Sequence, residues 1–518
     1  MNTVIGFVFL LPTVVYLLSG FLSRSGKRLN VIQKTVSATS YFSILSAIIG
    51  AAWLLMFEPI EANFFSLKGL GFSLRVDPLS VLMYSMISII ALVVIRYSKN
   101  YLEGDTRQGL FFYRLAVTIA FVQLLVLSGN LVTVFIAWVG TSLGLHKLLI
   151  FYPERKKAQL AARKKFIIAR VADITLLTAF VLIYNQFGTG DLGNIFKNLA
   201  AFGSDSLPLQ LKLAGILLVI TAGLKSVQIP FHGWLLDVME TPTPVSALLH
   251  AGLLNAGPFL IIRFSHLIDI ANEASIFLLV MGAASALFGA IVSTTQPTIK
   301  TALAYSSIGH MGFTLMVCGL GVYSASLLHL VAHSFYKAHS FLSSGSLVDQ
   351  IQTKSATYNS RLMNHWRILL ALISSILVYA VIAYLWGVSA NTEFQLLVIS
   401  TIIFFGILLL QINTLDSKNL VLSISYLLIG SVVVINAFFL FENLFEFILG
   451  SQVPEIRNPN SVTVNISLLI LLVFFLVVLS QVYYPQIKNL KAVRHLEVHF
   501  KNGLYFNSMF DRLMNSLK

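Results

Sequence analysis

The run 214-AGILLVITAGLKSVQIP-230 is the most informative segment of the chain, because it is apolar, carries a single charge, at Lys225, and ends in a proline. A charged side chain at the centre of a bilayer costs at least ~2.5–3.5 kcal/mol on insertion scales, so such residues usually serve a function. The proline removes a backbone donor and interrupts a helix. The run therefore predicts a broken membrane helix that buries a lysine.

The composition of the whole chain supports a membrane protein. Of its 518 residues, 57% are hydrophobic and only 11% are charged, which is too few charges to cover a soluble protein of this size. The net charge of +14 comes from basic residues in short loops between apolar runs, where they are typical of topology signals rather than of nucleic-acid binding. The single cysteine, Cys318, excludes a disulfide framework and a cysteine-ligated metal cluster.

Apolar stretches of about 18 or more residues predict roughly 15 transmembrane helices. The fold class expected is therefore an all-α polytopic membrane protein. The predicted spans are 3–22, 36–57, 79–96, 110–128, 131–152, 166–187, 209–230, 243–264, 274–294, 300–319, 322–347, 368–387, 394–412, 419–441 and 463–484.

The distribution of lysine and arginine predicts the orientation. Segments 23–34 and 153–165 and the tail from Lys488 onward are basic, and they fall on one side when 15 spans are threaded. The opposite segments 265–273 and 442–462 are acidic or nearly neutral. Since basic loops stay in the cytoplasm, we expect a bacterial inner-membrane protein with its N-terminus outside and its C-terminus in the cytoplasm.

Prolines gather in the middle third of the chain, around the lysine run. Single prolines can be simple packing kinks, but broken helices at membrane depth recur where they line an ion site. The next span, 243-TPVSALLHAGLLNAGPFLIIR-263, carries His250, whose imidazole can pass a proton near neutral pH but could equally be a structural core group. The prolines are Pro230, Pro242, Pro244, Pro258 and Pro297.

The segment 329-HLVAHSFYKAHS-340 is the strongest group of ionisable residues. His329, His333 and Lys337 follow i, i+4, i+8 spacing and so share one helix face, in steps of about 6 Å that one water could bridge. This arrangement suits a proton relay. The two histidines could instead hold a metal, but no carboxylate or cysteine accompanies them on that face, so we expect no metal. His310 is interpreted as isolated, and His339 as structural.

Four more residues are weaker candidates. Asp237 and Glu240 lie between Lys225 and His250 and could pair with the lysine, gate access to it or cap the next helix. Lys300 follows a proline and could join the relay or extend to the surface. Asp173 is a further candidate for the relay or its gating.

Several motifs resemble the large antiporter-like subunits of respiratory complex I and of Mrp cation/proton antiporters. The resemblance implies a bundle with inverted repeats and discontinuous helices, in which Lys225, His250, His329, His333 and Lys337 form the proton path. The motifs are 223-GLKSVQIPFHGWLLDVMETPTPVSALLHAG-252, 299-IKTALAYSSIGHMGF-313, 329-HLVAHSFYKAHSFLSSGSLV-348 and, more loosely, 75-RVDPLSVLM-83.

The sequence differs from that family's pattern at two places, and these differences narrow the choice of subfamily. The family's Trp-Glu-Gly motif supplies a glutamate that pairs with the lysine, whereas this chain has 138-WVG-140 with Val139; Asp173 is one candidate to compensate. No proline occurs between Thr298 and Val453, and the three spans from 368 to 441 hold no lysine or acid, so a second half-channel is not expected.

The chain resembles the DabB-type membrane subunits of DabA–DabB inorganic-carbon accumulation complexes. The resemblance lies in these departures, in the variant 250-HAGLLNAG-257 and in the tail 495-HLEVHFKNGLYFNSMFDRL-513. The resemblance implies that the chain conducts H⁺ or Na⁺ to energise a DabA-like partner of the β-carbonic-anhydrase type. Zinc and CO₂ hydration would belong to that partner, and this chain would need no cofactor and perform no catalysis. The amphipathic tail would contact the partner or lie on the membrane surface.

Three other functions stand as hypotheses beside the one that this resemblance implies. The alternative transporter is an Mrp- or complex I-type antiporter subunit; a membrane enzyme and a purely structural scaffold are the other two hypotheses. An enzyme would need a nucleophile–base set or a metal cluster, and the sequence offers neither.

The expected regions are N-terminal helices 1–108, a proton-conducting core 109–350, C-terminal helices 351–485 with a degenerate half-channel, and a cytoplasmic tail 486–518.

Overall fold

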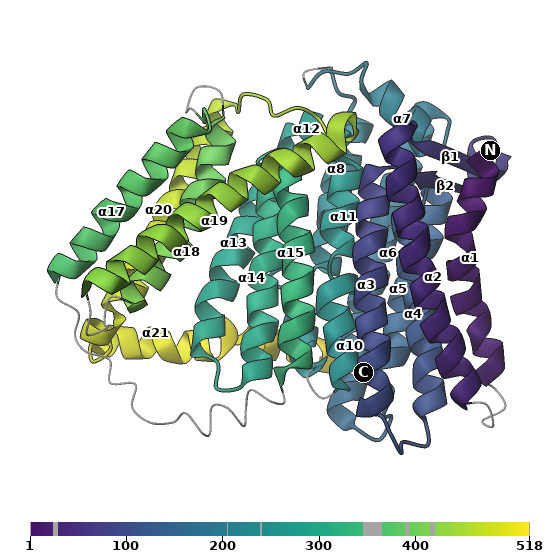
Figure 1. Cartoon of the computed structure of the whole chain (residues 1–518), viewed down its shortest axis with the longest axis horizontal. Coiled ribbons are helices and arrows are strands. Elements are labelled where there is room, and N and C mark those ends of the chain that lie inside the picture. The colour runs from purple at the N-terminus through teal and green to yellow at the C-terminus, as the bar shows by residue number, and fades with distance from the viewer. Residues whose placement is uncertain are drawn as a thin grey trace.

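The structure is a computed structural model of the chain, and it is a helical bundle with one small hairpin (Figure 1). The described residues are 2–23, 29–204, 206–238, 241–344, 365–388, 393–414 and 420–516.

The N-terminal elements are α1 (Asn2–Ser23), α2 (Leu29–Met56), β1 (Ile60–Leu67), β2 (Leu70–Val76), α3 (Pro78–Tyr101), α4 (Gln108–Leu127), α5 (Leu131–Leu149), α6 (Lys156–Phe187) and α7 (Leu192–Leu199). The central elements are α8 (Leu209–Lys225), α9 (Gly233–Asp237), α10 (Thr243–Leu248), the π-helical turn η2 (Leu249–Leu253), α11 (Ala256–Arg263), α12 (Ser265–Ile270), α13 (Asn272–Thr295), α14 (Ile299–Gly319) and α15 (Tyr323–Leu342). The C-terminal elements are α17 (His365–Leu385), α18 (Phe394–Thr414), α19 (Leu420–Leu449), η3 (Gly450–Gln452), α20 (Ser461–Ile487), α21 (Lys491–Lys501), η4 (Gly503–Tyr505) and α22 (Phe506–Ser516).

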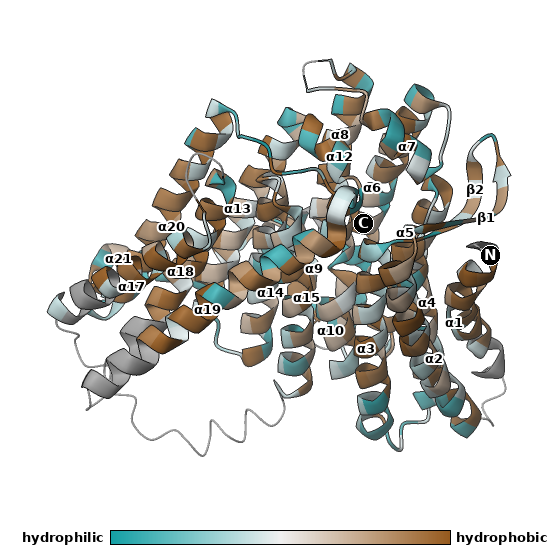
Figure 2. Cartoon of the chain, turned by 45° about the horizontal axis from the view of Figure 1, so that its top comes forward, coloured by the Kyte–Doolittle hydropathy of each residue, from teal (hydrophilic) through white to brown (hydrophobic). Residues whose placement is uncertain are grey.

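The all-α polytopic architecture predicted from the sequence is confirmed. Each predicted span overlaps a helix or a helical unit, and within the described residues nine helices are long and apolar enough to cross a membrane. The helices run side by side, with apolar residues along their middles and polar residues toward many of their ends (Figures 1 and 2). The chain is therefore a multi-pass membrane protein.

Three local features differ from the prediction. The segment 60–76 forms an antiparallel hairpin, β1–β2, whose turn places Lys68 and Gly69 at positive φ. The basic segment 153–165 is not all loop, because α6 begins at Lys156. Finally, α19 continues to Leu449, beyond the predicted end at 441, and crosses the bundle obliquely in Figure 1.

The helices begin where polar side chains can cap them. Asp77, Asn130 and Thr298 each accept a hydrogen bond from a backbone N–H in the first turn of α3, α5 and α14. These bonds satisfy donors that would otherwise stay unpaired at the start of a helix. The caps set the starting points of the two helices, α5 and α14, that supply oxygen atoms to the site.

Helices α13 and α14 approach each other through glycines. A Cβ atom on Gly289 would collide with the backbone of Gly309, so neither position tolerates a larger residue without displacement. Small residues let membrane helices approach closely. This contact holds α14, which carries His310, close against α13.

A buried ion pair joins α11 to the start of α3. Arg263 donates to both carboxylate oxygens of Asp77, at 2.5 and 3.3 Å, and Arg75 donates to the same carboxylate at 2.7 Å. Burial by itself raises the pKa of Asp77, but the charges of Arg263 and Arg75 outweigh it and hold that pKa below the usual range. The carboxylate is therefore charged at neutral pH.

We expect Asp77→Asn to destabilise the protein by about 3–5 kcal/mol, because it leaves the buried Arg263 guanidinium without a counter-charge while asparagine still caps α3. The measurement is thermal unfolding of the purified protein in detergent. Glu154→Gln is the matched control, since it breaks the exposed Arg107–Glu154 pair, which water screens, and should leave the melting temperature nearly unchanged. Equal losses of melting temperature in the two variants would contradict the prediction.

Candidate functional site

The site begins at the broken end of α8. The helix stops at Lys225, and Val227 adopts a positive φ of 61°, an unusual conformation for a β-branched residue. The N–H of Gln228 donates to the carbonyl of Gly223 at 3.0 Å, which closes the helix end as in a Schellman motif. Lys225 therefore lies at a helix C-terminus, where the helix dipole favours a cation. The predicted break before Pro230 is confirmed.

Neutral groups of α5 hold the ammonium of Lys225. It donates to the hydroxyls of Ser142 at 2.8 Å and Thr141 at 3.0 Å, and to the carbonyl of Trp138 at 3.3 Å. The Trp138 ring centroid lies 4.3 Å from the Nζ atom, which adds a cation–π contact. The Ser142 and Thr141 hydroxyls and the Trp138 ring thus surround the ammonium of Lys225. They take the role that the family's glutamate would have, since this chain has Val139 at that position.

A second lysine, which sequence reasoning assigned to a cytoplasmic loop, lies beside Lys225. Lys165 of α6 is 5% exposed and donates to the carbonyl of Ser142 at 2.5 Å. Both lysines line a cavity of about 20 Å³, which is large enough for one water. Asp173, the candidate replacement for the missing glutamate, pairs with Arg170 at 2.7 Å; the ion pairs of the described residues do not include one between Asp173 and Lys225.

The discontinuous helix α10–η2–α11 lies between the lysines and α15. His250, in η2, is fully buried, and its ring stacks on Phe341 at a centroid distance of 4.3 Å. Neither ring nitrogen of His250 has a hydrogen-bond partner among the described residues. The Asn255 side chain donates to the Ser334 hydroxyl at 2.7 Å, which ties this helix to α15.

The predicted row of ionisable side chains, formed by His329, His333 and Lys337, lies on one face of α15. His329 and His333 have nearly parallel rings, 6.0 Å apart between centroids. One turn further on, Lys337 is fully buried and donates to the Ser306 hydroxyl at 2.5 Å and to the Leu303 carbonyl at 3.2 Å, both on α14. Like Lys225, Lys337 is surrounded by neutral oxygen atoms.

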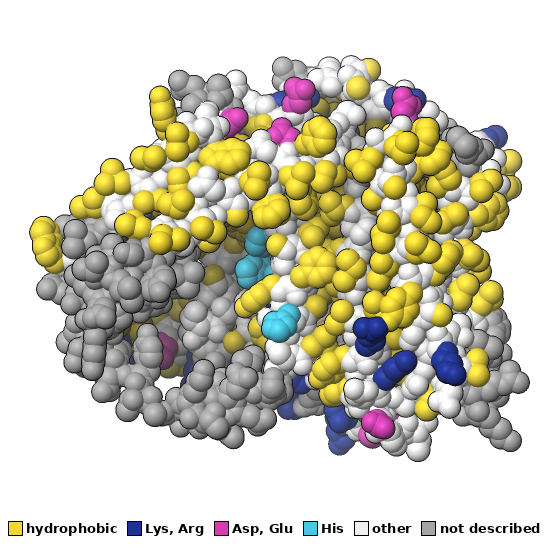
Figure 3. Space-filling view, viewed as in Figure 1, with side chains coloured by type: hydrophobic (Ala, Val, Ile, Leu, Met, Phe, Trp, Pro, Cys, Tyr) yellow, Lys and Arg dark blue, Asp and Glu magenta, His cyan; other side chains and the backbone are white. Residues whose placement is uncertain are grey.

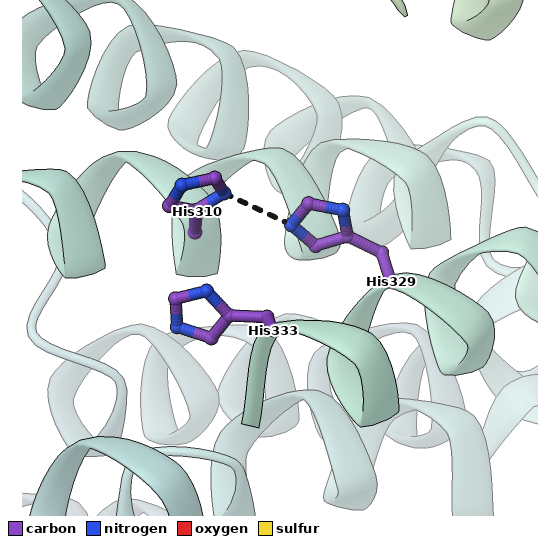
Figure 4. A group of neighbouring side chains, drawn as sticks. All are labelled: His310, His329 and His333. Atoms are coloured by element: carbon purple, nitrogen blue, oxygen red, sulfur yellow. Dashed lines mark hydrogen bonds between the residues drawn. The ribbon is translucent and has the colours of Figure 1, made fainter. Parts of the chain in front are cut away.

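His310, which the sequence analysis interpreted as isolated, joins this row from α14. Its Nδ1 atom lies 3.2 Å from Nε2 of His329, and its ring centroid lies 4.7 Å from that of His333 (Figure 4). The interpretation was wrong because helix packing, and not sequence proximity, brings His310 to the row.

A buried acid lies at the other end of α15. Ser324 donates to Glu442 of α19 at 2.6 Å, and Glu442 is 2% exposed. The span predicted from the sequence, 419–441, ends one residue before this acid and so excludes it. The apolar residues that follow the acid, up to Leu449, were the signal that the helix continues.

The remaining candidates lie away from Lys225. Asp237 pairs with Lys164 at 2.5 Å, and the same lysine pairs with Asp511 of α22, so this cluster fastens the C-terminal tail. Burial raises the pKa of Asp237, and Lys164 acts in the opposite direction. Lys300 lies 3.5 Å from the Thr243 hydroxyl at the start of α10. Glu240 lies outside the described residues.

Comparison with known proteins places these features in one family. The family model for the NADH:quinone oxidoreductase/Mrp antiporter membrane region matches residues 128–383, and the model for the complex I chain 5 N-terminus matches residues 65–112. Together they match more than half of the chain.

Curated relatives of two kinds, inorganic carbon transporter subunits and NADH-quinone oxidoreductase subunits, are similar to this chain. "Probable inorganic carbon transporter subunit DabB2" of Halothiobacillus neapolitanus is 43% identical over 290 residues, which is 56% of this chain and 52% of the relative. The DabB protein of Hydrogenovibrio crunogenus is 42% identical over 275 residues, 53% of each chain. NADH-quinone oxidoreductase subunit L of Mycobacterium tuberculosis is 35% identical over 280 residues, 54% of this chain and 44% of the relative. The chain thus spans about half the length of the curated relatives it matches.

Two solved structures share the fold. A chain of the Mrp complex from Dietzia sp. DQ12-45-1b superposes with a TM-score of 0.65 at 20% identity, covering 99% of this chain and 59% of that one. A chain of the archaeal membrane-bound sulfane sulfur reductase superposes with a TM-score of 0.62 at 17% identity, covering 98% and 99%. The two family models, which together match more than half of the chain, show that it belongs to the antiporter-like membrane subunits of the NADH:quinone oxidoreductase and Mrp superfamily.

Proposed function

We propose that the chain conducts H⁺ across a bacterial inner membrane and thereby energises a zinc-containing, DabA-like partner in inorganic-carbon accumulation. The observation that carries the proposal is the setting of Lys225 and Lys337. Each ammonium contacts hydroxyl and carbonyl oxygens instead of a carboxylate. A lysine whose direct hydrogen-bond partners are neutral loses its proton more easily than a lysine in an ion pair, which is what a relay requires.

The path would run from the lysine pair at Ser142, past His250, to the row on α15. Orphaned nitrogens on His250 and His333 support the presence of bridging waters, since buried polar atoms rarely stay unpaired. Glu442 and Ser324 would form the far end of the path. Lys300 and Asp173 remain proposed relay or gating residues.

The partner is proposed from the relatives named as inorganic carbon transporter subunits. In this proposal zinc and CO₂ hydration belong to the partner. The tail offers a surface for it, because α21 and α22 present apolar side chains outward while Lys164 fastens α22 to the bundle. The exposed apolar residues include Leu496, Val498 and Met509, each more than half exposed.

The proposed orientation places the N-terminus outside and the C-terminal tail in the cytoplasm. Figure 3 supports it, since on this face lysine and arginine gather at the lower edge, beneath a broad band of hydrophobic side chains. That is the edge along which α21 runs in Figure 1. Basic residues next to membrane helices favour the cytoplasmic side.

Complementation tests this function. Co-expression of the chain with its DabA-like partner should restore growth in air to a host that lacks carbonic anhydrase, and the chain alone should not. If the chain alone instead confers salt tolerance and the pair fails to rescue growth in air, the protein is an antiporter subunit and the proposal is wrong.

A further inference from the structure

Three histidines from two helices converge at one point of the row. Their ligand atoms all lie within 4.8 Å of one another, although His310 belongs to α14 and the other two to α15. His329 and His333 are four residues apart on a helix, the spacing with which helical histidine pairs chelate a metal. Figure 4 shows the His333 ring lying alongside the His310–His329 pair.

The distances suit a metal ion of the size of Zn²⁺. Zinc–nitrogen bonds of about 2.0–2.1 Å in a tetrahedral site separate two ligand nitrogens by about 3.3 Å. The Nδ1 atom of His310 and the Nε2 atom of His329 are already 3.2 Å apart. The third imidazole needs to approach by only about 1.5 Å to complete the set, a shift within reach of side-chain rotation.

His333 offers the nitrogen that such an ion would need. It is 4% exposed, and neither of its ring nitrogens has a hydrogen-bond partner among the described residues. A buried polar atom without a partner is unfavourable, so a ligand that accepts its lone pair is favoured.

The chemical types of the three ligands, and their exposure, indicate which class of metal ion the cluster would bind. The cluster holds three imidazoles and neither carboxylate nor thiolate, which favours borderline divalent ions such as Zn²⁺ over Mg²⁺ or Ca²⁺. His310 and His329 are only partly buried. Figure 3 shows histidine side chains exposed in a hollow beside α19, so an ion can reach this part of the molecule.

We propose that His310, His329 and His333 bind one Zn²⁺-class divalent cation, with water as a fourth ligand, and that the bound ion stops cation passage along α15. The second half of this statement rests on the proposed function. A divalent charge beside Lys337 repels any further cation in a low-dielectric interior, so the occupied site closes the row.

Equilibrium binding of Zn²⁺ to the full chain in nanodiscs, read with a competing chromophoric chelator, tests the site. The unmodified chain should bind one ion. His310→Gln should weaken binding by more than ~100-fold, since the loss of even an outer-sphere partner costs ~10–100-fold. His310→Cys, which restores a ligand, should bind again, and His339→Gln, on the exposed face of α15, should bind like the unmodified chain. Equal binding by the His310→Gln variant would overturn the proposal.

Proton flux into liposomes, measured with and without Zn²⁺, separates the two proposals. Flux in the unmodified chain that Zn²⁺ abolishes over the concentration range in which it binds, and that a chelator then restores, supports closure of the row. Flux insensitive to a saturating, bound ion overturns the closure. If the chain binds Zn²⁺ but shows no flux at all, the proposed function fails while the metal site stands.

Discussion

Lys225→Ala is expected to reduce proton flux through the reconstituted chain by roughly 100-fold or more, because the loss of a positioned proton donor typically costs ~10²–10⁴-fold. The variant removes the lysine that ends α8 and leaves the Ser142 and Thr141 hydroxyls without the cation to which they are bonded. The measurement is the initial rate of acidification of liposomes under an imposed potential.

The control for this prediction lies on the same helix. Lys212→Ala removes an exposed lysine that pairs with Glu273 at the opposite end of α8, so the flux should stay unchanged. Lys225→Arg adds a second test: arginine keeps the charge but does not release its proton, so it should be as inactive as alanine. An active arginine variant would show that Lys225 only fills space or supplies charge.

The features that could be predicted from the sequence are those with a local signal. Lys225 is a lone charge in an apolar run, Pro230 marks a break, and the spacing of His329, His333 and Lys337 defines a helix face. The lack of proline between Thr298 and Val453 likewise agrees with the helices α17, α18 and α19, none of which is interrupted within its described residues. Each of these inferences needs only the helical period and the cost of charge in hydrocarbon.

The features that were missed depend on packing or on the length of an element. His310 reaches the row because α14 packs against α15, and that contact between helices is not encoded in a local pattern. Lys165 follows a run of basic residues that looks like a loop, yet α6 carries it into the core. Glu442 was lost because α19, at 30 residues, is longer than the ~20 residues that a perpendicular span requires.

The hairpin β1–β2 was also missed, for a different reason. Its residues alternate only partly between buried and exposed, and the register shifts between Asn63 and Phe65. A Lys68–Gly69 turn between two apolar runs was the available signal. In a chain dominated by apolar helices, such a short element is easily taken for a loop between spans.

Lys337→Ala should also abolish measurable proton flux, and it distinguishes a relay from a scaffold. The ammonium bonds to Ser306 and Leu303 link α15 to α14, so a purely structural lysine would be needed for assembly but not for transport. In a relay, its loss interrupts the row next to His333 and lowers flux by roughly 100-fold, whatever happens to stability.

Two measurements on one preparation separate these roles. The first is the size-exclusion profile and melting temperature of the Lys337→Ala variant, and the second is its flux in liposomes, each compared with His339→Gln from the exposed face of the same helix. A folded, monodisperse variant without flux assigns Lys337 to proton transfer. A folded variant with full flux would mean that the lysine only holds two helices together, and the proton path would then have to bypass the end of α15.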